Sequence, residues 1–322
     1  MKKFLPIVFL IISNVYLSQN DQKSPGRGNS TSQVTSASAA FASSVLSDTC
    51  LDKKFSVVFY LINDSAYNIQ LSNPLSYAGY QLSLLINQMN AAFAPICVSF
   101  EHCKTVIIPV YPFNRWRAGV LGDHITSTWY TDKTINIYIP KLVMPIPPDP
   151  PDNCYAYTHP GNDTVVPRDA IILDSASVYE KNGIGYVGAP LMHALGHYFG
   201  LPHTFAEINP TVTVNPPPPP GCCSPAINTK EFVDRTDFNN CHTHGDGFCD
   251  TEADPFPSFI ATSLKKSSKD CSGSPGLKDG KGNFYKPPTD NFMSFYGCRC
   301  RYSKEQLNFM ARYMMTKRKY LH

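Results

Sequence analysis

Three histidines near the middle of the chain have the spacing of metal ligands. His193 and His197 stand four residues apart in the segment HALGHYFGLPH, and His203 ends it. Side chains four residues apart on a helix lie on the same face, one turn apart, so both imidazoles can reach one ion. Gly200 lets the chain leave the helix and bring His203 back as a third ligand. Three histidines with an open fourth position are typical of catalytic zinc sites.

A helix must present the first two histidines to the ion. Pro190 suits the first turn of a helix and Gly200 suits the left-handed residue after its end, which predicts a helix over residues 190–199. Apolar residues at helical spacing predict another helix over Tyr77–Phe93. Short apolar runs predict strands over residues 55–62, 97–100, 106–110, Ile135–Ile139 and Ala170–Leu173. The fold class expected is therefore α/β, with helices packed on one twisted mixed sheet.

Regular structure is expected to return only near the C-terminus. Residues 204–302 are rich in Pro, Gly and polar side chains and show no sustained periodicity. Ser303 and Gln306 have the spacing of a capping box, which predicts the start of a last helix. Leu307, Met310 and Met314 form the apolar stripe of that helix.

The N-terminus indicates the compartment. Lys2 and Lys3 precede a mostly apolar stretch up to Leu17, and polar residues begin at Ser18. This order is typical of a cleavable secretory signal peptide, here residues 1–19. Residues 20–53 are rich in Ser, Ala, Gly and Gln and predict a linker or short pro-segment. We therefore expect a secreted or periplasmic protein.

Charge and composition exclude several classes of partner. The chain has 322 residues, 43% of them hydrophobic, and a net charge of +3 that falls to +1 without the two lysines of the signal peptide. So weak a charge predicts no nucleic acid and no anionic membrane surface as partner. The long apolar stretch lies in the signal peptide, so no membrane insertion of the mature protein is expected.

The eleven cysteines are unevenly distributed. Four precede the histidine motif and seven follow it. In an oxidising compartment disulfides are the default state, so the second half is predicted to be rich in them. An odd total leaves at least one cysteine free, paired between chains, or removed with the pro-segment, and Cys50 is the one expected to be left over. His242 and His244 allow an auxiliary metal site, but a solvated loop is favoured because no further ligand pattern closes it.

Three segments together resemble one family of peptidases. HALGHYFGLPHTF is similar to the long zinc signature of the metzincins, and in particular of the pappalysin family. Residues 245–251 (GDGFCDT) resemble that family's GDxxxDT segment, and residues 291–295 (NFMSF) resemble its Met-turn. The resemblance covers residues 55–322 and is strongest from residue 169 onward. It implies a two-lobed metallopeptidase fold, with lobes 54–203 and 204–322, a zinc ion in the cleft, and protein or peptide substrates.

The resemblance also assigns roles to individual residues. His193, His197 and His203 would hold zinc, and Met293 would lie beneath the metal as a hydrophobic base. A calcium ion would lie near the GDxxxDT segment, with Asp246 and Thr251 as ligands and Asp250 as a weaker one; a turn held by Asx hydrogen bonds is the alternative. An edge strand would bind the substrate backbone through Tyr155, Ala156 and Tyr157, with a plain hairpin as the alternative.

Two positions depart from the family's pattern. Ala194 stands where the signature has a Glu that acts as general base and acid, and alanine can do neither. Phe295 stands where several metzincins place a Tyr whose hydroxyl stabilises the tetrahedral intermediate. We expect a site that binds metal and hydrolyses peptides poorly or not at all. Either Ala194 is an introduced substitution, which the intact ligands favour, or the chain is a natural pseudo-protease that binds peptides or proteins, which Phe295 favours.

Overall fold

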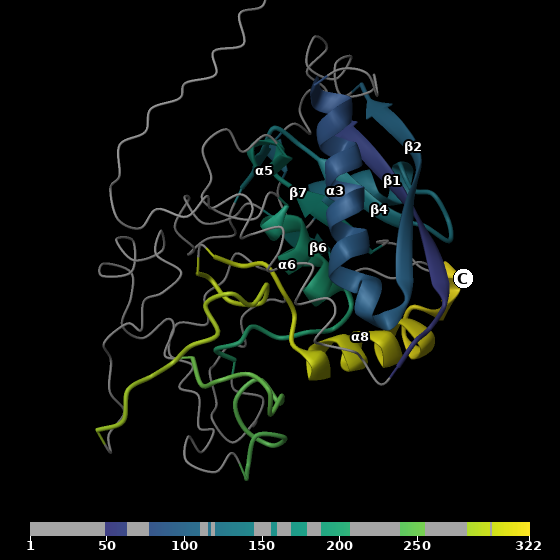
Figure 1. The fold of residues 1–322 in the computed structure, drawn as a ribbon. Helices are drawn as coiled ribbons and strands as arrows, with labels where there is room; N and C mark the ends of the chain where they lie inside the picture. Colours follow the sequence, from purple (N-terminus) through teal and green to yellow (C-terminus); the bar gives the residue numbers. More distant parts are fainter. Residues whose placement is uncertain are drawn as a thin grey trace, which may run out of the picture. The chain divides into compact units, whose positions relative to one another are not determined.

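A five-stranded sheet lies at the centre of the part of the chain that the computed structural model describes (Figure 1). The described residues are 49–62, 77–109, 115–116, 120–144, 156–159, 169–178, 188–206, 239–254, 282–296 and 298–322. The predicted signal peptide and most of the predicted linker lie outside them. The division into lobes 54–203 and 204–322 stays a prediction.

The strand order of the sheet is β2-β1-β4-β7-β6. The strands are β1 (Lys53–Ile62), β2 (Val98–Ile108), β4 (Ile135–Ile139), β6 (Ala156–His159) and β7 (Ala170–Leu173). The first four in this order pair in parallel, and β6 pairs antiparallel with β7 at the edge. The sheet is thus mixed, as predicted, and most of its strands are parallel. A small second sheet pairs β3 (Arg115–Trp116) with β5 (Leu142–Val143).

Two helices contact each other and pack on this sheet. Helix α3 (Tyr77–Phe93) packs against β2, and α6 (Ala189–Tyr198), which carries the first two histidines, packs against β6 and β7. A third long helix, α8 (Lys304–Thr316), runs near the lower end of α3 in Figure 1. The short elements are η1 (Ala94–Ile96), α4 (Val120–Thr128), α5 (Ser175–Val178) and η3 (Lys319–Leu321).

Helix α3 matches its prediction because its apolar periodicity is buried as expected. Leu82, Leu85 and Met89 are all at most 1% exposed. At its end, Phe93 contacts the rings of Phe100 on β2, Phe199 after α6 and Tyr302 before α8, with ring centroids 5.1, 5.8 and 5.4 Å apart. This aromatic cluster joins α3, the sheet and the ends of the two other long helices.

The prediction of two separate strands over 97–100 and 106–110 is wrong. The structure has one strand, β2, which pairs with β1 along its whole length. The register shifts once, where Val57 pairs with His102 and Val58 with Lys104, so that Cys103 is the extra residue of a β-bulge. The polar residues between the two apolar runs hid this continuity. They are tolerated because β2 is an edge strand whose outer side chains face solvent.

Helix α8 begins with the predicted capping box. The Ser303 hydroxyl accepts a bond from Gln306 N (3.2 Å), and Gln306 Oε1 accepts one from Ser303 N (3.0 Å). Gln306 Oε1 also accepts from Asn291 Nδ2 at 2.9 Å. The helix start is therefore tied directly to the segment that resembles a Met-turn.

Two disulfides lie wholly within the described residues, and their cysteines are 47 and 8 positions apart in the sequence. Cys50 pairs with Cys97, with Cα atoms 5.0 Å apart, and Cys241 pairs with Cys249. The expectation that Cys50 is the cysteine left over is wrong, because backbone bonds from Leu51 N and Lys53 N to the segment around Cys97 bring it to its partner. Disulfides are typical of an extracellular protein. None of the described helices is long and apolar enough to cross a membrane.

Candidate metal centre

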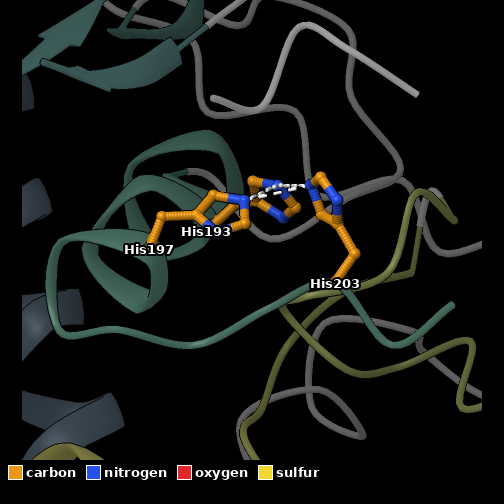
Figure 2. Close-up of side chains that lie close together, drawn as sticks. All are labelled: His193, His197 and His203. Carbon is orange, nitrogen blue, oxygen red and sulfur yellow. Dashed lines mark hydrogen bonds between the residues drawn. The ribbon is translucent and has the colours of Figure 1, made fainter. Parts of the chain in front are cut away.

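The three predicted ligands meet at one point. His193 and His197 project from α6, and His203 comes from the segment that follows the helix (Figure 2). Their Nε2 atoms lie 3.1 Å (193 to 197), 3.0 Å (197 to 203) and 3.2 Å (193 to 203) apart. Gly200 makes this possible: its φ of +89° is the left-handed conformation predicted for the residue that ends the helix.

The three nitrogens fit a small divalent ion. Ligands about 2.0–2.1 Å from a tetrahedral zinc ion lie about 3.3–3.4 Å from one another. The observed 3.0–3.2 Å is close to that spacing. The three Nε2 atoms would hold such an ion and leave its fourth ligand position for water.

Backbone carbonyls determine which nitrogen of two rings is free. His193 Nδ1 donates to Phe292 O at 2.6 Å, and His197 Nδ1 donates to Leu201 O at 2.8 Å. A carbonyl oxygen only accepts, so Nδ1 carries the proton in both rings and the neutral Nε2 presents a lone pair. Two lone pairs 3.1 Å apart repel, and a shared cation removes that repulsion. Such outer hydrogen bonds are the usual way in which ligating histidines are oriented.

Burial keeps the three rings neutral. Desolvation by burial is the main reason why the pKa values of His193 and His203 lie well below the ordinary value for histidine. The same cause lowers the pKa of His197 to about 4. Neutral imidazole is the form that binds metal, so the site needs no deprotonation before it binds an ion at neutral pH.

Met293 packs against the helix that carries His193 and His197, and its role as a hydrophobic base beneath a metal stays a prediction. It is fully buried and packs against α6 at Gly196, between the two helical ligands. Its carbonyl accepts a bond from Thr204 N at 3.2 Å. Since Thr204 follows His203, Met293 contacts both parts of the chain that supply ligands.

Aromatic rings form one side of the site. The ring of Phe295 lies 4.7 Å from that of His203 and 5.5 Å from that of His193. Phe205 stacks on His203 at 4.6 Å and lies 5.0 Å from Phe295. The sequence points to Phe295 because it lacks a hydroxyl. It gives only a weak signal for Phe205, which follows the last histidine by two residues.

Neither the general base nor the stabilising hydroxyl of a peptidase stands at its expected position. Ala194 is fully buried on α6 next to His193 and offers no proton-transferring atom. The hydroxyl of Tyr296 does not replace the one missing from Phe295, because it donates to Asp254 at 2.9 Å. Asp254 also accepts from Thr204 at 2.8 Å. This buried carboxylate, which sequence reasoning missed, ties the chain after His203 to the chain after Phe295.

The proposed calcium ligands lie in a hydrogen-bonded turn. Thr251 Oγ1 donates to Asp246 at 2.8 and 2.9 Å, and Phe248 N donates to Asp246 Oδ1 at 3.1 Å. Burial raises the pKa of Asp246 to about 7. Asp250 faces elsewhere, since its Oδ2 accepts from Glu305 N in the first turn of α8 (2.8 Å). These contacts are those of the Asx-turn alternative, and calcium binding stays a prediction.

Strand β6 lies at the edge of the sheet beside α6, the helix that carries His193 and His197. Ala156 and Tyr157 pair with Leu173 and Ile172 of β7, and α6 packs against β6. Tyr155 lies outside the described residues. The predicted edge strand therefore has the right place, and peptide binding along it stays a prediction.

A disulfide joins two members of the second cluster of possible metal ligands. Cys241, His242 and Cys249 gather together, but the two cysteines are bonded to each other. His242 is exposed and its Nε2 lies 3.3 Å from Cys249 Sγ. A disulfide lacks the thiolates that bind metal, which supports the interpretation of this segment as a loop.

Comparisons with protein families and with curated proteins found no relative of this chain. No family model matches the chain. A search of curated proteins likewise found no match.

Proposed function

We propose that this chain is a secreted or periplasmic zinc protein of the metzincin type, similar to the pappalysin peptidases, whose site as written has lost its general base. The convergence of three Nε2 atoms within 3.0–3.2 Å carries the proposal. The two Nδ1–carbonyl bonds support it, because they direct lone pairs at the point where an ion would lie. The two-lobed arrangement, with a cleft between residues 54–203 and 204–322, is part of the same proposal.

The chain's own residues define what the site can do. A bound zinc ion would polarise a carbonyl and bring the pKa of its water towards about 7. His193, His197 and His203 would hold that ion and Met293 would support α6 beneath it. Ala194 can neither take a proton from water nor pass one to a leaving amine, and loss of a general base costs about 10²–10⁴-fold in rate. Peptide substrates would add to the sheet along residues 155–157.

A second candidate function has its own supporting observation. Phe295 fills the position of a stabilising hydroxyl with a ring that contacts His203, His193 and Phe205. An aromatic cluster built around the ligands suits a site that binds a peptide or protein without cutting it. In this candidate the chain is a natural pseudo-protease.

The unmodified chain and three variants separate the two candidate functions. The chain as written, Ala194→Glu, Ala194→Gln and Ala194→Glu/Phe295→Tyr are purified, their zinc content is measured, and each is incubated with casein and gelatin. Glutamine has the shape of glutamate without its basicity, so it is the matched control. The peptidase proposal expects about one zinc per chain in all four and cleavage by the Glu forms alone.

The other outcomes are equally informative. If the Glu forms hold zinc and remain inert, the pseudo-protease candidate is favoured. If His197→Ala holds as much zinc as the chain as written, or if that chain holds none, the metal-site assignment fails.

A further inference from the structure

A second group of possible metal ligands lies in the loop that the disulfide between Cys241 and Cys249 closes. The sulfur atoms of these two cysteines and a ring nitrogen of His242 all lie within 4.8 Å of one another. His242 Nε2 is 3.3 Å from Cys249 Sγ. Two thiolates and one imidazole are ligands that zinc binds in structural sites. In the oxidised chain the sulfurs are bonded to each other, so this set is closed to an ion.

The spacing of these atoms is close to that of a zinc site. A sulfur and a nitrogen that bind one tetrahedral zinc ion lie about 3.5 Å apart, and two such sulfurs lie about 3.8 Å apart. The distance from His242 to Cys249 is already near the first value. After reduction the sulfurs would have to separate from about 2.0 Å to about 3.8 Å. Rotation of one cysteine side chain to another rotamer covers so short a movement.

Hydrogen bonds other than the disulfide also hold the loop in this shape. The two backbone N–H groups that follow His242 both donate to Asn240 O, at 2.9 and 3.0 Å. At the other end of the loop, Cys249 N donates to Glu305 Oε2 in the first turn of α8, at 2.7 Å. Both cysteines are therefore expected to stay close to His242 when the bond between them is broken.

The disulfide can be reached from solvent on one side. His242 is exposed and Cys249 is partly exposed, whereas Cys241 is 5% exposed. A thiolate can thus approach Cys249 Sγ, and exposed disulfides are among those that are reduced most readily. The side that admits the thiolate also carries His242, so an ion can enter there once the bond is open.

We propose that Cys241, His242 and Cys249 form a second metal site, closed by the disulfide and opened by a dithiol reductant. The dithiol gives up two electrons and two protons and becomes a disulfide, while the Cys241–Cys249 bond breaks and two thiols form. A soft divalent ion such as zinc then displaces both thiol protons to solvent and binds the two thiolates and His242 Nε2. The site shares no residue with the three-histidine centre, so it goes beyond the proposed function and does not depend on it.

The test measures the protection of individual cysteines in the full chain. The protein is reduced with dithiothreitol, separated from it without air, and incubated with or without zinc chloride. Iodoacetamide then modifies free thiols, and mass spectrometry measures the modification at each cysteine. We expect zinc to slow the alkylation of Cys241 and Cys249 at least about tenfold, because a metal-bound thiolate is a poor nucleophile. Alkylation of Cys103, which is exposed and unbonded, should not change.

Variants of two neighbouring histidines show whether His242 is a ligand. In His242→Ala the zinc concentration that protects the two cysteines should rise about tenfold or more, because one of three ligands is gone. His244→Ala is the matched control: it removes a histidine two residues away in the same loop and should be protected as the unmodified chain is. Equal protection in His242→Ala and the unmodified chain would overturn the proposal.

A third variant gives a result even if the fully reduced chain unfolds. Cys241→His keeps a metal ligand at residue 241 but cannot form the disulfide, so Cys249 has a free thiol without any reductant and the bond between Cys50 and Cys97 stays intact. Zinc should slow the alkylation of Cys249 in this variant, and an unchanged rate contradicts the inference. Failure of this protection in a chain that holds zinc at the three histidines refutes this inference alone. Protection in a chain whose three histidines hold no zinc refutes the proposed function alone.

Discussion

The sulfur of Met293 occupies the space that a side chain on Gly196 would need. A Cβ on Gly196 would lie 2.2 Å from Met293 Sδ. Gly196 lies on α6 between His193 and His197, so the turn that presents both ligands rests directly on the methionine. A helix glycine, which elsewhere weakens a helix, here permits the close contact between the metal helix and the segment around Met293.

Gly196→Ala should destabilise the protein and weaken metal binding together. The added methyl group must displace Met293, and overpacking of a core costs about 1–3 kcal/mol. Because Met293 supports the turn that carries two ligands, zinc affinity should fall as well. Urea unfolding of the metal-free protein and competition with a zinc chelator measure the two effects. An unchanged urea midpoint would show that Met293 can move aside freely.

The double variant Gly196→Ala/Met293→Ala is the control for that contact. Met293→Ala alone should cost about 2–5 kcal/mol, because it leaves a cavity. The methyl group at residue 196 fills part of that cavity, so the double variant should lose less stability than the sum of the single losses. Additive losses would mean that the two residues do not interact.

Arg318→Ala should cost about 3–5 kcal/mol, because it leaves a charged group buried without its partner. Asp169 is fully buried, and its Oδ2 accepts from Arg318 Nη1 and from Tyr320 Oη, the latter at 2.6 Å. Arg318 Nε also donates to Tyr198 O at 3.1 Å, at the end of the metal helix. Lys317→Ala changes an exposed charge one residue away and should shift the urea midpoint little. Equal losses in the two variants would contradict this account.

Asp246 should make the protein less stable as the pH rises from about 4 to about 7. Its folded pKa is raised to about 7 from an ordinary value of 3.8, so in that range the unfolded chain releases a proton that the folded chain keeps. At about 1.36 kcal/mol per pH unit the loss is on the order of 4 kcal/mol. Asp246→Asn keeps the shape and removes the titration. The difference in unfolding free energy between the two proteins, measured at pH 5, 6, 7 and 8, should follow this course.

Added calcium tests whether Asp246 is a calcium ligand. If Asp246, Thr251 and Asp250 bind calcium, the ion favours the ionised carboxylate and should restore stability at pH 8 in the unmodified chain but not in Asp246→Asn. Identical curves with calcium and with a chelator would favour the hydrogen-bonded turn alone.

Removal of the disulfide between Cys50 and Cys97 should destabilise the protein by about 4 kcal/mol. The two cysteines are 47 residues apart, and the chain-entropy model gives about this value for a loop of that length. Cys50→Ser/Cys97→Ser is compared with the unmodified chain by urea unfolding. Cys103→Ser is the control, since Cys103 is exposed and unbonded, and it should leave the midpoint unchanged. A loss below about 1 kcal/mol would show that the unfolded chain is already compact around this loop.

The elements that were predicted correctly are those with a strong local pattern. Helix α3 and strands β4 and β7 have the predicted bounds, and α6 is shifted by one residue. Apolar residues repeat in each with the period of its own structure, which depends only on near neighbours in the chain. Strand β2 was missed as one element because its polar middle interrupts the pattern, and only pairing with β1 shows that it continues.

The sequence by itself determined the three candidate ligands, because the spacing of His193, His197 and Gly200 follows from the geometry of one helix and its end. It also determined that residues 194 and 295 carry neither a carboxylate nor a hydroxyl. The tertiary structure decided the rest: the carbonyls of Phe292 and Leu201 that orient two rings, the contact of Met293 with Gly196, and the partner of Cys50. All but the Leu201 carbonyl join residues nearly 50 or more positions apart. Packing of the whole chain, and no local periodicity, brings such residues together.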